Sequence, residues 1–231
     1  DGNAVPAGDR AYLEAQALAM YDELSPETGE FFRFMCEHEL MSLETRPAKA
    51  NGGFCTFLPD YSAPFIFSNF NGTSGDVDVL THEAGHAFQA FRSCRAQALP
   101  EYWESTYEVC EIHSMSMEYF AYPWMERFFG EGAGKYKTRH LLDAITFVPY
   151  GVCVDEFQHR VYEAPDLTPA ERRALWRSLE KKYLPHRDYD GKTIFTSGAF
   201  FFKQLHIFMD PFYYIDYTLA SMGAFECYGK M

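Results

Sequence analysis

Two histidines and a glutamate in the run VLTHEAGHAFQAF form the most distinctive chemical pattern in the sequence: His82, Glu83 and His86. Histidines at positions i and i+4 of a helix project from one face, about 5–6 Å apart at their Cβ atoms, so both imidazoles can bind one ion. Glu83 flanks that face and can reach a water on the ion, where it would act as general base. Gly85 leaves room beside the face for a further ligand. The pattern H-E-x-x-H therefore predicts a catalytic zinc site rather than two packing histidines on an ordinary helix.

A catalytic zinc needs a third protein ligand, because such sites hold three protein ligands and one open position. The run YEVCEIHSMSMEYF follows the histidine motif and is typical of a helix that returns across the first one. Glu111 is central in this run and is the ligand that we favour. His113 is the competing ligand, but it points about 200° round the helix from Glu111. A hydrogen-bonded packing role fits His113 better.

Two further glutamates border the same face of that helix, Glu108 and Glu118. A metal-bound histidine usually donates its other ring N–H to a carboxylate or a carbonyl group. Glu108 and Glu118 suit this role beside His82 or His86. A solvated carboxylate is the alternative for either.

Composition indicates a soluble folded protein and excludes several partners. The chain has 231 residues, of which 47% are apolar and 23% charged, enough for one large domain or two small ones. A net charge of −13 argues against binding of nucleic acid and gives little attraction to an anionic membrane surface. No apolar run approaches the roughly 20 residues that span a bilayer. Six scattered cysteines without a framework, and no leader, predict a cytoplasmic protein with reduced thiols.

The periodicity of apolar residues predicts a mainly α fold with a small β-sheet. The stretch 51–75 is rich in Gly, Pro, Asn and β-favouring residues, and predicts the two strands. Thr168 as N-cap, with Pro169 and Glu171 after it, marks the start of one helix. We expect a loop at YLPHRDYDGKT. The expected strands are 53–58 and 64–69, and the expected helices are 9–24, 27–44, 76–95, 102–129, 136–162 with a break near 149–151, 168–182, 194–208 and 211–226.

Four more runs accompany HEAGH in a familiar order: EIHSMSMEYF, VDEFQHRVYE, KYLPHRDYDG and HIFMDPFYYIDYTLAS. With them, most of residues 50–226 resembles the oligoendopeptidase F and thimet oligopeptidase family of zinc metallopeptidases, and is most similar to the bacterial oligoendopeptidase F branch. The resemblance implies a zincin-type (gluzincin) helical catalytic domain that hydrolyses internal peptide bonds of short peptides. It implies one Zn²⁺ on His82, His86 and Glu111, with Glu83 as the base.

The same resemblance implies that the C-terminal run faces the substrate and its oxyanion, through His206, Tyr214 and Tyr217. A phenol O–H near the metal stabilises the negative charge that builds on a carbonyl oxygen. Tyr214 and Tyr217 are three residues apart and share a helix face. Tyr213 is an alternative, since the spacing between the histidine and the tyrosines varies within the family. A stripe of aromatic core residues would also explain the run PFYYIDY.

Relatives in this family are considerably longer, with helical regions on both sides of the part seen here. We therefore expect residues 1–50 to be a helical segment leading into a catalytic domain over 51–231 that is incomplete at both ends. Gly52 and Gly53 precede a strand whose edge could pair with an extended peptide, although they could equally form a simple turn.

Two other functions fit the motif. Another zinc hydrolase, such as an aminopeptidase, would need a site for the free amine of its substrate. A non-catalytic, zinc-stabilised peptide-binding domain would have no use for Glu83. The sequence does not indicate an oligomeric state.

Overall fold

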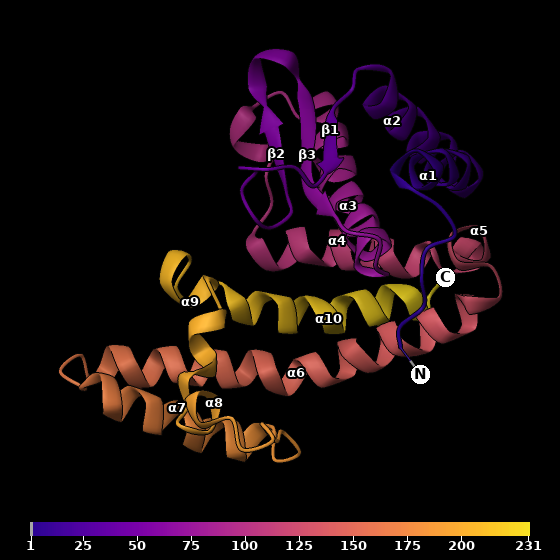
Figure 1. The fold of residues 1–231 in the computed structure, drawn as a ribbon. Coiled ribbons are helices and arrows are strands. Elements are labelled where there is room, and N and C mark those ends of the chain that lie inside the picture. Colours follow the sequence, from indigo (N-terminus) through magenta and orange to yellow (C-terminus); the bar gives the residue numbers. More distant parts are fainter. Residues whose placement is uncertain (1) are drawn as a thin grey trace. The chain divides into compact units, whose positions relative to one another are not determined.

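The computed structural model describes residues 2–231, and it confirms a mainly helical fold with one small sheet (Figure 1). The strands are β1 (Met41–Glu44), β2 (Phe54–Leu58) and β3 (Ala63–Phe70). The helices are α1 (Arg10–Leu24), α2 (Pro26–Glu37), α3 (Gly75–Ala96), α4 (Tyr107–Phe120), α5 (Met125–Phe129), α6 (Ala133–Glu163), α7 (Pro169–Tyr183), α8 (Thr193–Thr196), α9 (His206–Met209) and α10 (Tyr214–Gly229). Within residues 2–231, none of the helices combines the length and the apolar character needed to span a bilayer.

The chain divides into two compact units. The first unit comprises Asp1–Leu141 and Gly223–Met231, and the second comprises Leu142–Met222. The boundaries fall inside α6 and α10. The division expected at residue 51 stays a prediction.

The sheet of the first unit has the strand order β1-β3-β2, so β2 lies at an edge. β2 pairs antiparallel with β3, from Phe54 opposite Phe67 to Leu58 opposite Ala63. Alternate residues of β3 are buried, as the period of a strand requires, and α3 packs against β2 and β3 (Figure 1). The buried side of α3 carries Val77, Leu80, Ala84, Ala87 and Phe91, at the three- and four-residue spacing of one helix face.

One predicted helix ends early. Instead of running to residue 44, α2 stops at Glu37, and Met41–Glu44 forms β1, parallel to β3. Met41 and Leu43 are buried while Ser42 and Glu44 are more exposed, which is the alternation of a strand. The pairing with β3 is a long-range interaction that overrides the local helical pattern.

Three other boundaries differ from expectation. The helix predicted over 102–129 is divided into α4 and α5 by a 3₁₀ turn at Tyr122–Trp124, which contains Pro123. The break predicted near 149–151 is absent, because α6 continues through Pro149. The helix predicted over 194–208 consists of α8, a 3₁₀ turn at Ala199–Lys203, and α9, separated at Gly198, whose φ is +89°.

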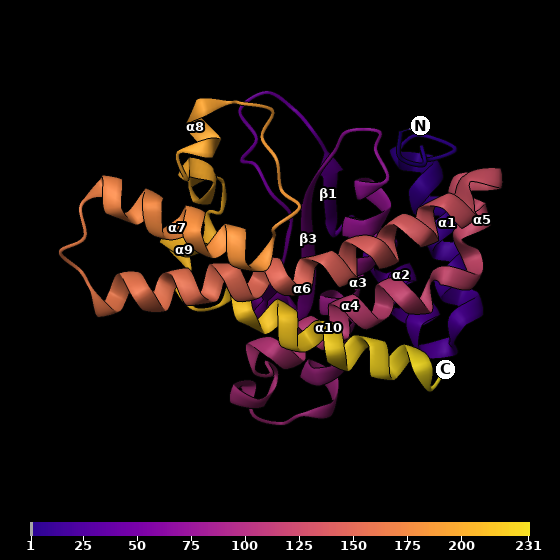
Figure 2. The same cartoon turned by 90° about the horizontal axis from the view of Figure 1, so that it is seen from below.

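In the second unit, α7 runs back alongside the C-terminal half of α6 (Figures 1 and 2). The capping box predicted at its start is confirmed, since Thr168 and Glu171 each accept a hydrogen bond from the backbone N–H of the other. Trp176 packs edge-on against Phe157 in the core of this unit. The predicted loop after α7 is tied to the helix by Glu180, which is fully buried and accepts a hydrogen bond from the Tyr189 hydroxyl.

Candidate metal centre

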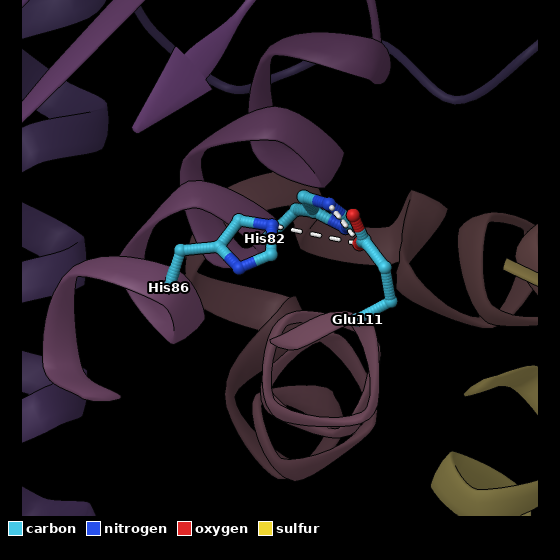
Figure 3. A group of neighbouring side chains, drawn as sticks. All are labelled: His82, His86 and Glu111. Atoms are coloured by element: carbon cyan, nitrogen blue, oxygen red, sulfur yellow. Dashed lines mark ion pairs between the residues drawn. The ribbon is translucent and has the colours of Figure 1, made fainter. Parts of the chain in front are cut away.

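His82 and His86 on α3 converge with Glu111 on α4 (Figure 3). The Nε2 atoms of His82 and His86 lie 3.2 Å and 3.5 Å from the same Glu111 oxygen, Oε2. Around a tetrahedral zinc with metal–ligand distances near 2.0–2.1 Å, ligand atoms are about 3.3 Å apart. The two nitrogen-to-oxygen distances match this spacing, and the ligand atoms of all three residues lie within 4.8 Å of one another, so the group fits a zinc ion that keeps an open fourth position.

Gly85 allows the two helices to approach closely enough for this convergence. A Cβ atom at position 85 would lie 2.6 Å from the Cα of Ser114 and 2.7 Å from the carbonyl oxygen of His113. Only a residue without a side chain fits against the α4 backbone at this distance. The His113 ring lies outside the group of candidate ligands in residues 2–231. Burial, aided by the charge of His86, lowers the pKa of His113.

The ligand carboxylate is buried and held from its own helix. Glu111 is 2% exposed, and the Ser114 hydroxyl donates to its Oε2 at 2.9 Å. Burial raises the pKa of Glu111, but the hydrogen bonds and charges of His82 and His86 outweigh it and hold the pKa well below its usual range. For His82, burial lowers the pKa, and the hydrogen bonds that its ring donates to Glu111 and Glu118 more than reverse this.

Glu83 lies beside the ligand cluster without belonging to it. It is 6% exposed, and its Oε2 atom has no hydrogen-bond partner among residues 2–231. Burial is the largest effect on its carboxyl group and raises its pKa. Its Oε1 atom is 3.5 Å from the position that a Cβ on Gly53 would occupy, so the carboxylate lies next to the start of β2. A buried carboxylate with a raised pKa is suited to accept a proton.

Glu118 lies behind His82. Its Oε1 atom is 2.6 Å from His82 Nδ1, and its Oε2 atom is 2.6 Å from Nε2 of His140. Sequence reasoning missed His140, which lies 22 residues beyond Glu118 on another helix. It also missed Ser114, although the i, i+3 spacing from Glu111 could have indicated that contact. Glu108 is half-buried and has no hydrogen bond or ion pair in residues 2–231, so its supporting role stays a prediction.

His206 and three tyrosines form an aromatic cluster in the second unit. The His206 ring centroid lies 5.0 Å from that of Tyr214, 5.9 Å from that of Tyr217 and 6.0 Å from that of Tyr213. Tyr214 is 8% exposed and packs in the core of this unit, and burial raises its pKa. Tyr213 and Tyr217 are half-buried. The substrate-facing roles of these residues stay predictions.

Comparison with known proteins covers almost the whole chain. The sequence profile of Peptidase family M3 matches residues 11–230. A solved structure assigned as an oligoendopeptidase F aligns with 99% of the chain at 60% identity, with a TM-score of 0.97. PZ peptidase A with an inhibitor aligns with 99% at 58% identity and a TM-score of 0.97. A protein from Bacillus anthracis str. Ames, assigned as an oligoendopeptidase F, aligns with 99% at 52% identity and a TM-score of 0.87.

The chain spans only part of these relatives, namely 40%, 41% and 38% of their respective lengths. A solved structure from Chlamydophila abortus, with 17% identity and a TM-score of 0.62, shares the fold. None of the curated proteins compared with the chain matches it. The similarity confirms the expected helical zincin-type fold.

Proposed function

The chain belongs to Peptidase family M3, and we propose on this premise that it is a zinc-dependent endopeptidase acting on short peptides. The convergence of His82, His86 and Glu111 on one point, with Glu83 beside it, carries the proposal. The resemblance to oligoendopeptidase F supports it at the level of the family.

The chemistry divides between the ion and the side chains around it. Zinc, when bound by His82, His86 and Glu111, supplies Lewis acidity that polarises a peptide carbonyl and lowers the pKa of water. Glu83 takes a proton from the attacking water and passes it to the nitrogen of the leaving amine. A hydroxyl group from the tyrosines of the C-terminal run, Tyr217 or Tyr214, donates to the oxygen on which negative charge builds.

The burial of Glu83 fits its proposed role. A raised pKa makes this carboxylate a stronger base than an exposed one, which helps it to take a proton from water. Oε2 has no partner of its own among residues 2–231, so one oxygen is free to hydrogen-bond to water. A site that only stabilised the fold would gain nothing from such a group, because an unpaired buried carboxylate costs free energy.

The edge strand β2 supports cleavage at internal bonds. It begins next to Gly53, whose missing side chain leaves the space beside Glu83 Oε1 open. A peptide added to β2 by backbone hydrogen bonds would be held by its main chain, without need of a free terminus. An aminopeptidase would instead require a group that binds the substrate amine.

Cleavage of a quenched-fluorescent peptide that is acetylated at its N-terminus tests this proposal. We expect the chain to cleave it, a chelator to stop the reaction, and zinc to restore it. Glu83→Gln should bind about one zinc ion per chain and lose turnover by a factor of at least about 100. Glu163→Gln, at the exposed end of α6, serves as the control.

Three results would contradict the proposal. Full activity in Glu83→Gln would show that Glu83 is not the general base. Cleavage of free peptides but not of acetylated ones would favour an aminopeptidase. Tight zinc and peptide binding without any cleavage would instead favour the non-catalytic alternative.

A further inference from the structure

His140 belongs to a hydrogen-bonded chain that begins at His82, and it has no part in the proposed reaction. His82 Nδ1 lies 2.6 Å from Glu118 Oε1, and Glu118 Oε2 lies 2.6 Å from His140 Nε2. His140 Nδ1 lies in turn 2.6 Å from the Tyr122 hydroxyl oxygen. We infer that His140 is a positioning residue of the metal centre: it fixes the Glu118 carboxylate so that His82 presents Nε2 to the ion. This inference rests on the proposed zinc site.

The hydrogen-bonding capacities of these groups fit one arrangement. A neutral His82 that binds a metal through Nε2 carries its proton on Nδ1, which then donates to Glu118. An ionised carboxylate can only accept, so the second oxygen of Glu118 also needs a donor. His140 supplies it from Nε2–H. Nδ1 of the neutral His140 ring is then an acceptor, and Tyr122 O–H donates to it. Each side-chain nitrogen and oxygen that links His82, Glu118, His140 and Tyr122 thus has a partner of the complementary kind.

Burial makes the donor from His140 hard to replace. The side chains of Glu118 and His140 are only 12% and 10% exposed, which leaves water little access. A buried acceptor without a donor is unfavourable, so a Glu118 carboxylate that lost His140 would rotate toward another donor. Turning the carboxylate moves Oε1 away from His82 Nδ1. His82 would then lose the contact that selects its tautomer and the direction of its ring.

The His140 ring is itself held in place by aromatic neighbours. Tyr119 meets it edge-on, with ring centroids 5.4 Å apart, and Tyr136 stacks on it at 5.7 Å. The Tyr136 hydroxyl donates to Oδ1 of Asp78 at 2.6 Å, which anchors that ring to α3. The imidazole therefore has a fixed orientation from which to direct Nε2–H at Glu118. A rigid support of this kind determines how well a metal-binding side chain is preorganised.

The test compares His140→Leu with His140→Gln in the chain of 231 residues. Leu removes the donor, whereas the Gln amide can donate at about the reach of Nε2. Zinc affinity is measured by competition with a fluorescent chelator, and the His82 tautomer, through its Nδ1–H signal, by ¹⁵N NMR of histidine-labelled protein with zinc bound. We expect His140→Leu to bind zinc about tenfold more weakly and to lose the Nδ1–H signature of His82. His140→Gln should recover most of both. His186→Leu, in the exposed loop after α7, is the control.

Tyr122→Phe provides a second measurement that leaves the imidazole in place. Tyr122→Phe should shift zinc affinity and the His82 tautomer in the same direction as His140→Leu, but by a smaller factor. It provides the test if both His140 variants unfold. If His140→Leu folds and keeps the zinc affinity and His82 tautomer of the parent, the inference is overturned. If the His140 variants unfold, the same result in Tyr122→Phe overturns it. A parent chain that binds no zinc would overturn the metal centre and the role of His140 with it. A parent chain that binds zinc but cleaves no peptide would overturn only the proposed endopeptidase activity.

Discussion

The Cα atom of Ser114 lies so near Gly85 that a Cβ atom on the glycine would be only 2.6 Å away from it. This contact sets the distance between α3 and α4, and through it the distance between Glu111 and the two histidines. The metal centre therefore depends on a residue that provides no ligand. Its effects can be separated from those of the ligands by mutation.

Gly85→Ala should destabilise the fold and weaken zinc binding together, because α4 must move away from α3 to admit the methyl group. Overpacking of this kind costs about 1–3 kcal/mol. Urea unfolding and a chelator competition measure the two effects. Gly134→Ala is the control, since a Cβ at that position of α6 meets nothing within 4 Å; it should be neutral or stabilise slightly. Equal behaviour of the two variants would show that the close approach has no importance.

Ser114→Ala should lower zinc affinity with little change in fold stability. The Ser114 hydroxyl donates to the Glu111 oxygen that faces both histidines, so its removal frees the carboxylate to rotate. Loss of such a supporting contact typically costs about 10–100-fold in metal affinity, and we expect the lower end. Ser178→Ala on α7 removes a hydroxyl that, within residues 2–231, donates to a backbone carbonyl alone, and should leave zinc affinity unchanged. A chelator competition on both variants is the measurement, and identical affinities would contradict the prediction.

Tyr217→Phe and Tyr214→Phe should differ in their effects. Tyr217 is half-buried, and loss of one oxyanion donor lowers kcat by about 100-fold or more. Tyr214 packs in the core of the second unit, so Tyr214→Phe should alter stability more than kcat. Steady-state kinetics on an internally cleaved peptide, beside thermal unfolding, separates the two effects. A larger kcat loss in Tyr214→Phe would make Tyr214 the donor instead.

Glu156→Gln should remove an acid-sensitive part of the stability of the second unit. Hydrogen bonds from Lys182 and Tyr183, with a weaker one from Arg160, lower the pKa of Glu156 to about 2. A folded-state pKa below the ordinary 4.5 means that this stabilisation is complete above about pH 4.5 and is lost as the pH falls toward 2.

The measurement is the free energy of unfolding in urea between pH 7 and pH 3. Parent and Glu156→Gln should differ most at pH 7 and converge at low pH. Glu163→Gln removes an exposed carboxylate on the same helix that has no hydrogen bond or ion pair in residues 2–231, and should track the parent throughout. A difference that is constant with pH would mean that the charge of Glu156 does not stabilise the fold.

Local signals explain what the sequence could predict. The start of α7 follows from Thr168, Pro169 and Glu171, whose interactions span three residues. The spacing of His82, Glu83 and His86 is a property of one helix. The choice of Glu111 needed only a second helix crossing the first, and the structure brings that carboxylate to the histidines.

Long-range packing explains what could not be predicted. Met41–Glu44 is a strand because β3 lies next to it, and this partner strand lies outside residues 27–44. Pro149 ordinarily interrupts a helix, yet α6 continues through it. His140 meets Glu118 only once α6 has packed against α4, so its place near the metal centre has no signature in the spacing of residues.

The path from His82 through Glu118 to His140 joins positions separated by 36 and then by 22 residues along the chain. During synthesis on a ribosome, α3 and α4 can emerge and fold before His140 has left the exit tunnel. A zinc ion captured at that stage would be bound by ligands whose support is still missing, and would exchange quickly. If His140 supports His82 as inferred, zinc would be held more tightly once α6 has docked than before.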